Sequence, residues 1–183
     1  QADLTPVYYQ NAALTQVYTN AELVPYANWT ASGYRLPTEA EWEKAARGGL
    51  SQQRFPWGGT ISESVANYYG ATASFSYDLG PNGYNSSFTN GVIPYTSPAG
   101  YFAANGYGLC DMAGNAYTWC WDWYGTSYVG GNDLHGPATG TSRVLRGGSW
   151  NGDAYFLRCA YRDDDSPADA SNDFIGLRCV REL

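Results

Sequence analysis

Cysteine is the residue type with the broadest chemistry in this chain, which contains Cys110, Cys120, Cys159 and Cys179. Thiolates can act as nucleophiles, redox centres and ligands for soft metals. These cysteines lack the paired C-x-x-C spacing of zinc sites, and they are too few for a disulfide scaffold. An oxidising compartment would allow alternative pairings, so the sequence leaves the pairing open.

The single histidine and a group of aspartates are the other candidates. His135 lies in a loop-forming segment, residues 132–137, and we interpret it as loop surface because no second histidine is available for a metal site. Five aspartates lie within residues 163–173. Paired carboxylates can hydrolyse glycosides, but no spacing here selects two of them. Such a charge run is usually a solvated loop, and Arg158, Arg162 and Arg178 are near enough in sequence to offset its repulsion.

Composition limits the classes of protein to which the chain can belong. Its 183 residues fit one domain, and 44% hydrophobic with 16% aromatic residues exclude a disordered chain. The 22 glycines and 9 prolines predict short strands joined by long, packed loops. The net charge of −7 argues against nucleic acid and anionic lipid as partners. No apolar run reaches the length of a membrane span, so direct membrane insertion is not expected.

One helix is clearly predicted, over residues 35–49. Thr38 is placed to cap it, and Glu41 three residues later completes a capping box. Glu39 and Arg47 favour the positive and negative ends of the helix dipole, while Gly48 supplies a left-handed end.

The remaining elements are expected to be short. Residues 1–33 indicate short strands and loops, and residues 49–108 form loops that aromatic side chains anchor to the core. Residues 119–123 alternate as a strand, with Trp119, Trp121 and Trp123 interpreted as the core face and Cys120 and Asp122 on the other. Further strands are predicted at 143–146, 158–162 and 175–181.

Several motifs resemble those of a known family. They are residues 35–43 (Arg-Leu-Pro-Thr-Glu-Ala-Glu-Trp-Glu), 55–58 (Phe-Pro-Trp-Gly), 105–109, 111–115, 119–123, 146–150 (Arg-Gly-Gly-Ser-Trp) and 176–178. In this order they resemble the formylglycine-generating enzyme, or sulfatase-modifying factor, family from about Gly33 onward. The resemblance implies an α+β fold of the variant C-type-lectin-like class, with few short strands and helices and extensive irregular loops. It also implies a single domain over residues 1–183 that lacks the family's N-terminal strand and helix.

The resemblance fails at the residues that carry catalysis. Enzymes of the family oxidise a substrate cysteine with two reactive cysteines, spaced C-x-x-x-x-C after Gly-Gly-Ser, that bind copper(I). Here residues 149–157 contain no cysteine, and neither hydroxyl nor amide groups replace soft thiolates. No catalytic residue is therefore assigned, and copper is not expected. The resemblance places Cys159 and Cys179 at structural disulfide positions, the partner of Cys159 at Ala46, and that of Cys179 in the missing N-terminal part.

The resemblance also implies calcium as a structural ion. One site would use the Asp111 carboxylate with the Gly114 and Ala116 carbonyls, but Thr118 replaces the family's glutamate, which weakens the site. A second site would begin at Asn67 and the Tyr68 carbonyl, with a further ligand near Asn90. The alternative is that side-chain hydrogen bonds hold these loops without an ion.

The C-terminal third also resembles the variable proteins of diversity-generating retroelements, some of which have this lectin-like fold. Frame residues such as Trp150, Ala154 and Arg158 alternate with small polar or aromatic residues, a mixture that suits an adaptable binding surface. The predicted ligand-binding residues are Tyr117, Thr118, Asn151, Asp153, Tyr155, Phe156, Asp163, Asp164, Asp165, Ser166, Ala168, Asp169, Ser171, Asn172 and Asp173.

These observations predict a non-catalytic ligand-binding domain whose partner is a protein or another macromolecule. The alternative is a formylglycine-generating oxidase acting on the cysteine of sulfatases. A sugar-binding lectin is disfavoured because the Glu-Pro-Asn and Gln-Pro-Asp tripeptides are absent, and a purely structural domain is a further interpretation. Family habit and the acidic, lysine-poor composition favour an extracellular or cell-surface location.

Overall fold

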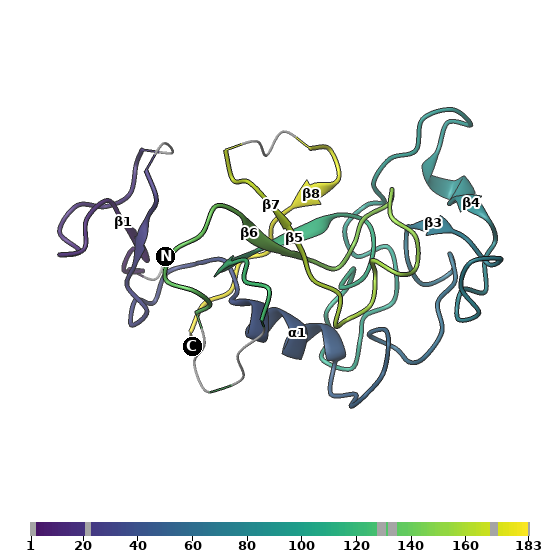
Figure 1. Ribbon diagram of the computed structural model, residues 1–183, viewed down its shortest axis with the longest axis horizontal. Helices are drawn as coiled ribbons and strands as arrows, with labels where there is room; N and C mark the ends of the chain where they lie inside the picture. The colour runs from purple at the N-terminus through teal and green to yellow at the C-terminus, as the bar shows by residue number, and fades with distance from the viewer. Residues whose placement is uncertain (1–2, 21–22, 128–130, 132–134, 169–171, 183) are drawn as a thin grey trace. The chain divides into compact units, whose positions relative to one another are not determined.

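The computed structural model describes residues 3–20, 23–127, 131, 135–168 and 172–182 (Figure 1). Its regular elements are short, as the glycine and proline content predicts. In chain order they are β1 (Tyr8–Tyr9), β2 (Tyr26–Ala27), α1 (Glu39–Arg47), β3 (Tyr69–Gly70), β4 (Gly83–Tyr84), the 3-10 helix η1 (Ser86–Phe88), β5 (Tyr117–Trp123), β6 (Arg143–Arg146), β7 (Asp163–Asp165) and β8 (Ile175–Gly176).

Backbone contacts divide the chain into two compact units. The first comprises Gln1–Pro37 with Arg178–Leu183, and in it β1 pairs with β2 in antiparallel fashion. The backbones of Arg35 and Val180 exchange two hydrogen bonds, of 2.9 and 2.8 Å, which tie the C-terminal segment to the N-terminal one. The prediction of short strands and loops in this region is confirmed.

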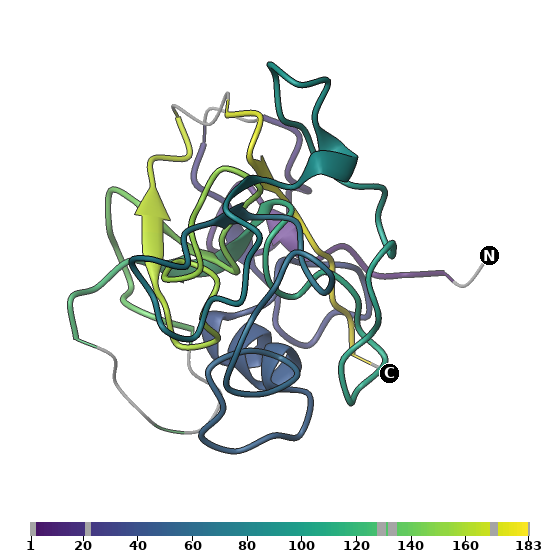
Figure 2. The same cartoon turned by 90° about the vertical axis from the view of Figure 1, so that its right-hand side faces the viewer.

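The second unit, Thr38–Leu177, contains a four-stranded sheet in the order β7-β6-β5-β8. β6 pairs antiparallel with both β5 and β7, and β8 joins β5 in parallel. Helix α1 packs on one side of this sheet, against β5 and β6 (Figures 1 and 2). In the part of the chain that the structure describes, no helix is long and apolar enough to span a bilayer.

Helix α1 forms as its sequence predicts. The Thr38 side chain accepts a hydrogen bond from the Glu41 amide, and the Glu41 carboxylate accepts one from the Thr38 amide, so the capping box is complete. Gly48 adopts φ 55° and ends the helix in the left-handed region. These contacts are local, which is why the sequence alone determines them.

Two strand predictions need correction. Residues 143–146 form β6 as expected, but residues 158–160 form a bend and a turn, residues 161–162 have no regular structure, and the neighbouring strand is instead the acidic β7. In 175–181 only Ile175–Gly176 joins the sheet, while Val180 pairs with Arg35. β7 pairs with β6 through backbone hydrogen bonds, so an acidic segment can form this strand without burying its aspartate side chains among apolar residues.

The buried face of β5 is also the opposite of the predicted one. Cys120 and Asp122 are buried, whereas the three indoles at 119, 121 and 123 are half-buried. The Asp122 carboxylate accepts a 2.7 Å hydrogen bond from the Glu39 amide, so α1 covers this face. The Arg143 guanidinium lies 3.6 Å from the Trp123 ring centroid and covers the indole face. Alternation groups residues by face, but only packing decides which face is inside.

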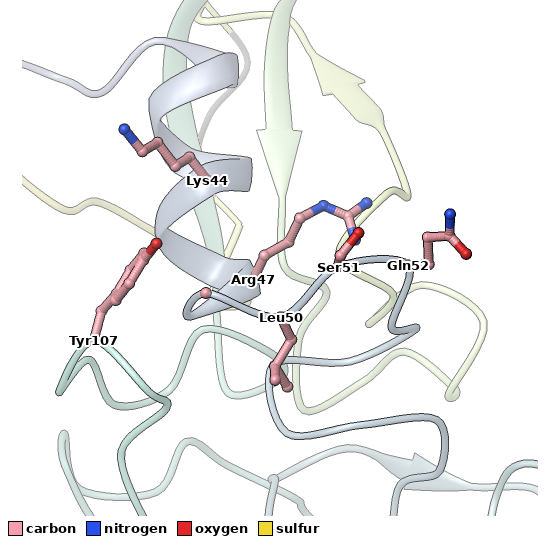
Figure 3. Close-up of a pocket in the computed structure, with 7 residues that line it drawn as sticks. Lys44, Arg47, Leu50, Ser51, Gln52 and Tyr107 are labelled. Atoms are coloured by element: carbon pink, nitrogen blue, oxygen red, sulfur yellow. The ribbon is translucent and has the colours of Figure 1, made fainter.

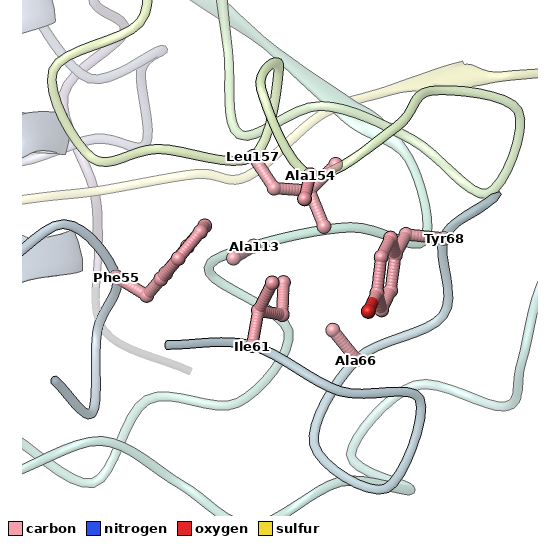
Figure 4. Close-up of a cluster of buried hydrophobic side chains, with 7 residues drawn as sticks. All are labelled: Phe55, Ile61, Ala66, Tyr68, Ala113, Ala154 and Leu157. Carbon is pink, nitrogen blue, oxygen red and sulfur yellow. The ribbon is translucent and has the colours of Figure 1, made fainter. Parts of the chain in front are cut away.

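Two apolar clusters hold the second unit together. In the first, side chains from separate loops and turns converge (Figure 4), and its buried members are Phe55, Ile61, Ala66, Tyr68, Ala113, Ala154 and Leu157. The second lies between α1 and the sheet and contains Trp42, Ala46, Met112, Cys120, Val144 and Cys159. Buried side chains therefore anchor the long loops to the core, and most of the side chains in the first cluster are apolar.

Candidate functional site

Residues 149–157 occupy the stretch where the resemblance places the reactive cysteines. Ala154 and Leu157 are buried in the first apolar cluster, whereas Asn151 and Tyr155 are exposed. Asp153 fixes the turn, because its carboxylate accepts a 2.9 Å hydrogen bond from the Tyr155 amide. Buried frame residues thus alternate with accessible ones, and the accessible ones carry amide, carboxylate and aromatic groups.

Tyr155 belongs to a continuous stack of rings and guanidinium groups. The Phe75 ring lies 6.2 Å from the Tyr155 ring and 5.4 Å from that of Tyr77, with interplanar angles of 30° and 25°. Arg158 covers Tyr155 at 3.8 Å and Arg54 covers Tyr77 at 4.2 Å. We call these five residues the aromatic stack. The neighbours on its faces hold Tyr155 in place although its side chain is 41% exposed.

The sequence did not identify three of the stack residues as part of a site. Arg54, Phe75 and Tyr77 lie more than 70 positions from Tyr155 in the chain, in a region interpreted only as anchored loop. The many aromatic residues of that loop indicate that rings anchor it to the core, but they do not indicate which rings stay accessible to a ligand. Burial raises the pKa of Tyr77, so its phenol stays protonated at neutral pH.

A second aromatic group flanks Asn151. Tyr69 and Tyr84 pack edge to face with centroids 4.9 Å apart, and Tyr84 lies 6.2 Å from the Trp150 ring. The Tyr84 hydroxyl donates a 3.1 Å hydrogen bond to Asn151 Oδ1. The hairpin of β3 and β4 therefore contributes to the same surface as the segment 149–157.

The acidic strand β7 divides into two kinds of carboxylate. Asp163 Oδ2 accepts a 2.9 Å hydrogen bond from the Tyr117 hydroxyl, and Oδ1 accepts one from the Asp164 amide. The Asp165 carboxylate accepts from the Ser166 amide at 2.8 Å and from Asn172 Nδ2 at 3.0 Å. Asp164 is exposed. Two aspartates thus brace the local backbone, and one faces solvent.

Two predicted ligand-binding residues lie beneath the surface. The Tyr117 and Thr118 residues of β5 are 6% and 5% exposed. Burial and the neighbouring Asp163 raise the pKa of Tyr117 well above its usual value, and burial together with Asp163 raises that of Tyr161 to about 12. The buried Tyr117 hydroxyl therefore remains protonated and donates a hydrogen bond to the Asp163 carboxylate.

The other predicted surface residues differ in their exposure. Phe156 and Ser166 are half-buried, whereas Ala168, Asn172 and Asp173 are exposed. Asp169 and Ser171 fall outside the described residues. The Arg162 guanidinium, a possible counter-charge to the aspartates in the sequence, binds both oxygens of Glu39 at 2.5 and 2.7 Å.

The buried thiols do not fit a copper(I) site. Cys120 and Cys159 are enclosed in the second apolar cluster, and neither forms a disulfide. Burial raises the pKa of both thiols, that of Cys159 to about 11, which opposes formation of the thiolate that copper(I) needs. Ala46, where the resemblance places the partner of Cys159, packs in the same cluster.

The predicted calcium ligands are part of a hydrogen-bonded loop assembly. Asn67 Nδ2 donates to the Tyr95 carbonyl, and the Asn67 carbonyl accepts from the Asn115 amide at 2.8 Å. Asp111 Oδ2 accepts a 2.6 Å hydrogen bond from the Gly100 amide. An added Cβ on Gly114 would lie only 2.5 Å from the Asn67 carbonyl oxygen, so the two predicted calcium sites adjoin. Ala116 and the Tyr68 carbonyl complete the predicted set, and calcium here remains a prediction.

A shallow hollow of about 480 Å³ lies at the C-terminal end of α1 (Figure 3). Lys44, Arg47, Tyr107 and the turn at residues 49–52 line it. Arg47 is already paired with Glu43 at 2.7 Å. Basic residues at this end complement the helix dipole, so the hollow is explained without a ligand.

Known proteins of similar sequence match most of the chain. The model of the sulfatase-modifying factor enzyme 1-like domain family matches residues 14–183. The chain is 43% identical over 161 residues to serine/threonine-protein kinase pkn1 of Chlamydia caviae, and the match covers 85% of the chain and 22% of that protein. It is 39% identical over 173 residues to the formylglycine-generating enzyme of Thermomonospora curvata, covering 88% of the chain and 53% of the enzyme.

Among solved structures, Treponema denticola variable protein 1 superposes with a TM-score of 0.74 at 30% sequence identity. The match covers 97% of the chain and 62% of that protein. The chain thus spans about a fifth of the first relative and about half of the second.

Proposed function

The chain belongs to the sulfatase-modifying factor family, and from this premise we propose that it is a non-catalytic ligand-binding domain. The fold prediction is confirmed, because one helix, short strands and long anchored loops form the variant C-type-lectin-like α+β fold of these relatives. A shared fold does not determine function, so the proposal rests on the site.

One observation carries the proposal. Where the family's enzymes have their reactive cysteines, this chain presents Asn151, Asp153 and Tyr155 on a turn whose frame residues are buried. A rigid scaffold with accessible aromatic and small polar groups is typical of adaptable binding surfaces. Similarity to a Treponema denticola variable protein supports this interpretation.

The partner is proposed to be a protein or another macromolecule. The aromatic stack, the Tyr69–Tyr84 pair and the solvent-facing carboxylate of Asp164 together offer apolar area with hydrogen-bonding groups at several points. Pre-ordered tyrosines lose little conformational entropy on binding, which favours them as anchors.

Sequence variation among sibling copies tests the proposal genetically. If the coding region is diversified, copies beside a reverse transcriptase and a near-identical template repeat should differ at the accessible positions, such as Asn151, Asp153, Tyr155 and Asp164. The buried frame, such as Ala154 and Leu157, should be constant. Differences spread evenly along the chain would contradict diversification.

A display library tests the scaffold directly. Randomising the exposed residues Asn151, Tyr155 and Asp164 should leave most variants folded, within a few degrees of the parent melting temperature, and should yield binders to a chosen protein. A matched library at Ala154, Leu157 and Cys159 should lose folding, because these side chains are buried. Loss of folding in the first library as well would contradict a variable surface.

The second candidate is a formylglycine-generating oxidase, which the identity to the Thermomonospora curvata enzyme favours. Its test is incubation of a cysteine-containing sulfatase-motif peptide with the protein, copper and oxygen. We expect no aldehyde in the peptide by mass spectrometry. Aldehyde that disappears in the Cys120→Ser and Cys159→Ser variants would establish the enzyme and refute the binding-only proposal.

A further inference from the structure

Two carboxylates that are not part of the proposed binding surface are buried on neighbouring stretches of backbone. Glu63 is 7% exposed and Asp78 4% exposed. Residues 61–63 run alongside 77–80, with the Ile61 amide donating to the Tyr77 carbonyl at 2.9 Å and the Glu63 amide donating to the Gly80 carbonyl at 3.1 Å. The backbone thus brings the two acids into one buried location.

The Asp78 carboxylate accepts three hydrogen bonds, which leaves acceptor capacity on Oδ2. Its Oδ1 accepts from the Tyr68 hydroxyl at 2.5 Å and from the Gly80 amide at 2.9 Å, and its Oδ2 accepts from the Ala71 amide at 2.6 Å. Tyr68 packs its ring in the first apolar cluster and carries its hydroxyl at the end of that ring (Figure 4). Three donors therefore hold the Asp78 carboxylate in a fixed orientation.

Glu63 is in the opposite situation. Its Oε1 is buried and has no hydrogen-bond partner. Burial, followed by repulsion from Asp78, raises the pKa of Glu63 to about 7. Among the described residues neither acid forms an ion pair. A buried carboxylate without a counter-charge is strongly unfavourable.

We propose that Glu63 and Asp78 bind a calcium ion. The two carboxylates supply hard oxygen ligands, and one divalent cation balances two negative charges. The described residues contain no group of three His, Cys, Asp or Glu side chains suited to a metal, so backbone carbonyls or water must complete the coordination. These acids are separate from the ligand set that the family resemblance implies.

The ion would fasten a loop that serves the binding surface. Residues 61–80 include Tyr69, Phe75 and Tyr77, which belong to the two aromatic groups. Crosslinking the start and end of this loop through one ion opposes its opening. The site itself does not depend on the proposed binding function.

A proton competes with calcium for the Glu63 carboxylate, and proton binding and calcium binding depend on pH in opposite ways. The folded-state pKa of about 7 is above the ordinary value of 4.5. The stability that this group contributes in the absence of metal is therefore fully present below about pH 4.5 and falls as pH rises through 7. Calcium should act most strongly at pH 8, where Glu63 is ionised.

The experiment is thermal unfolding of the full chain at pH 8, first with EDTA and then with millimolar CaCl₂. Calcium should raise the melting temperature of the wild type by several degrees but not that of Glu63→Gln. In EDTA, Glu63→Gln should melt above the wild type because it buries no charge, and calcium should reverse this order. Glu182→Gln, which removes an exposed charge, should respond as the wild type does.

Three results would overturn the proposal. One is a wild type that calcium does not stabilise, and another is a shift that NaCl of equal ionic strength reproduces. The third is a calcium response that survives in Glu63→Gln but disappears in Asp111→Asn, because the ion would then occupy the family's ligand set. Because Glu63→Gln is nearly isosteric, it should fold and keep each of these outcomes measurable.

Discussion

Glu39 shows how one residue can serve both a helix and the core. Its position in the first turn suits the helix dipole, as the sequence predicts. In the structure it is also buried, binds Arg162 with both oxygens, and lies 3.4 Å from Nε of the fully buried Arg146. Arg146 additionally pairs with Glu43. Removing the Glu39 carboxylate would leave the buried Arg146 with Glu43 as its remaining carboxylate partner.

We expect Glu39→Gln to lower the free energy of unfolding by about 3 kcal/mol, the lower end for breaking a buried ion pair, because Glu43 remains beside Arg146. Urea unfolding followed by tryptophan fluorescence measures this. Glu182→Gln, at an exposed position, should change stability by less than about 0.5 kcal/mol. Equal effects of the two substitutions would show that the network does not stabilise the fold.

Among the secondary-structure elements, β7 is an edge strand. Its aspartate side chains accept hydrogen bonds from backbone amides in and directly after the strand. The carboxylates of Asp163 and Asp165 accept hydrogen bonds from the amides of Asp164 and Ser166, each the next residue along the chain. Exposed edge strands invite pairing with another chain, and charged residues commonly prevent it. The acidic run therefore has a structural role as well as a place on the surface.

The double substitution Asp163→Ala and Asp165→Ala should free these amides and promote association through β7. Size-exclusion chromatography with light scattering should show a larger associated fraction, rising with concentration. Each lost hydrogen bond should also cost about 1 kcal/mol of stability. Asp164→Ala is the matched control, since it removes charge but no hydrogen bond to the backbone amides. If both variants associate equally, charge repulsion rather than amide capping protects the edge.

At the scale of the whole molecule, the buried residues are unevenly distributed. Both apolar clusters and the four-stranded sheet belong to Thr38–Leu177. The other unit has two-residue strands, and its buried residues are few: Val7, Ala31, Gly33, Arg35 and Pro37 among those described. Local opening requires little free energy where few apolar contacts are lost.

Hydrogen exchange should reflect this distribution. Amides of β5 and β6 should exchange at least tenfold more slowly than those of β1 and β2, which corresponds to about 1.4 kcal/mol in opening free energy. Mass spectrometry of peptic fragments at several exchange times measures the difference. Equal protection in both units would show that the chain opens as one cooperative body.

The sequence by itself determined the features that depend on local interactions or on whole motifs. Thr38, Glu41 and Gly48 specify the ends of α1 because each acts within one helical turn. The ordered motifs were sufficient to identify the family and hence the fold. The absence of cysteine from residues 149–157 is likewise a property of the sequence, and it removes the thiolates on which the family's chemistry depends.

Tertiary structure decided the features that depend on partners distant in the chain. The Asp122 face of β5 is buried because α1 lies on it, and Arg162 binds Glu39, which is 123 positions away in the chain. The aromatic stack joins Phe75 to Tyr155, and the Glu63–Asp78 pair depends on two backbone stretches lying side by side. Periodicity and composition describe a residue's own segment, whereas burial, ion pairing and ring stacking are set by what packs against it.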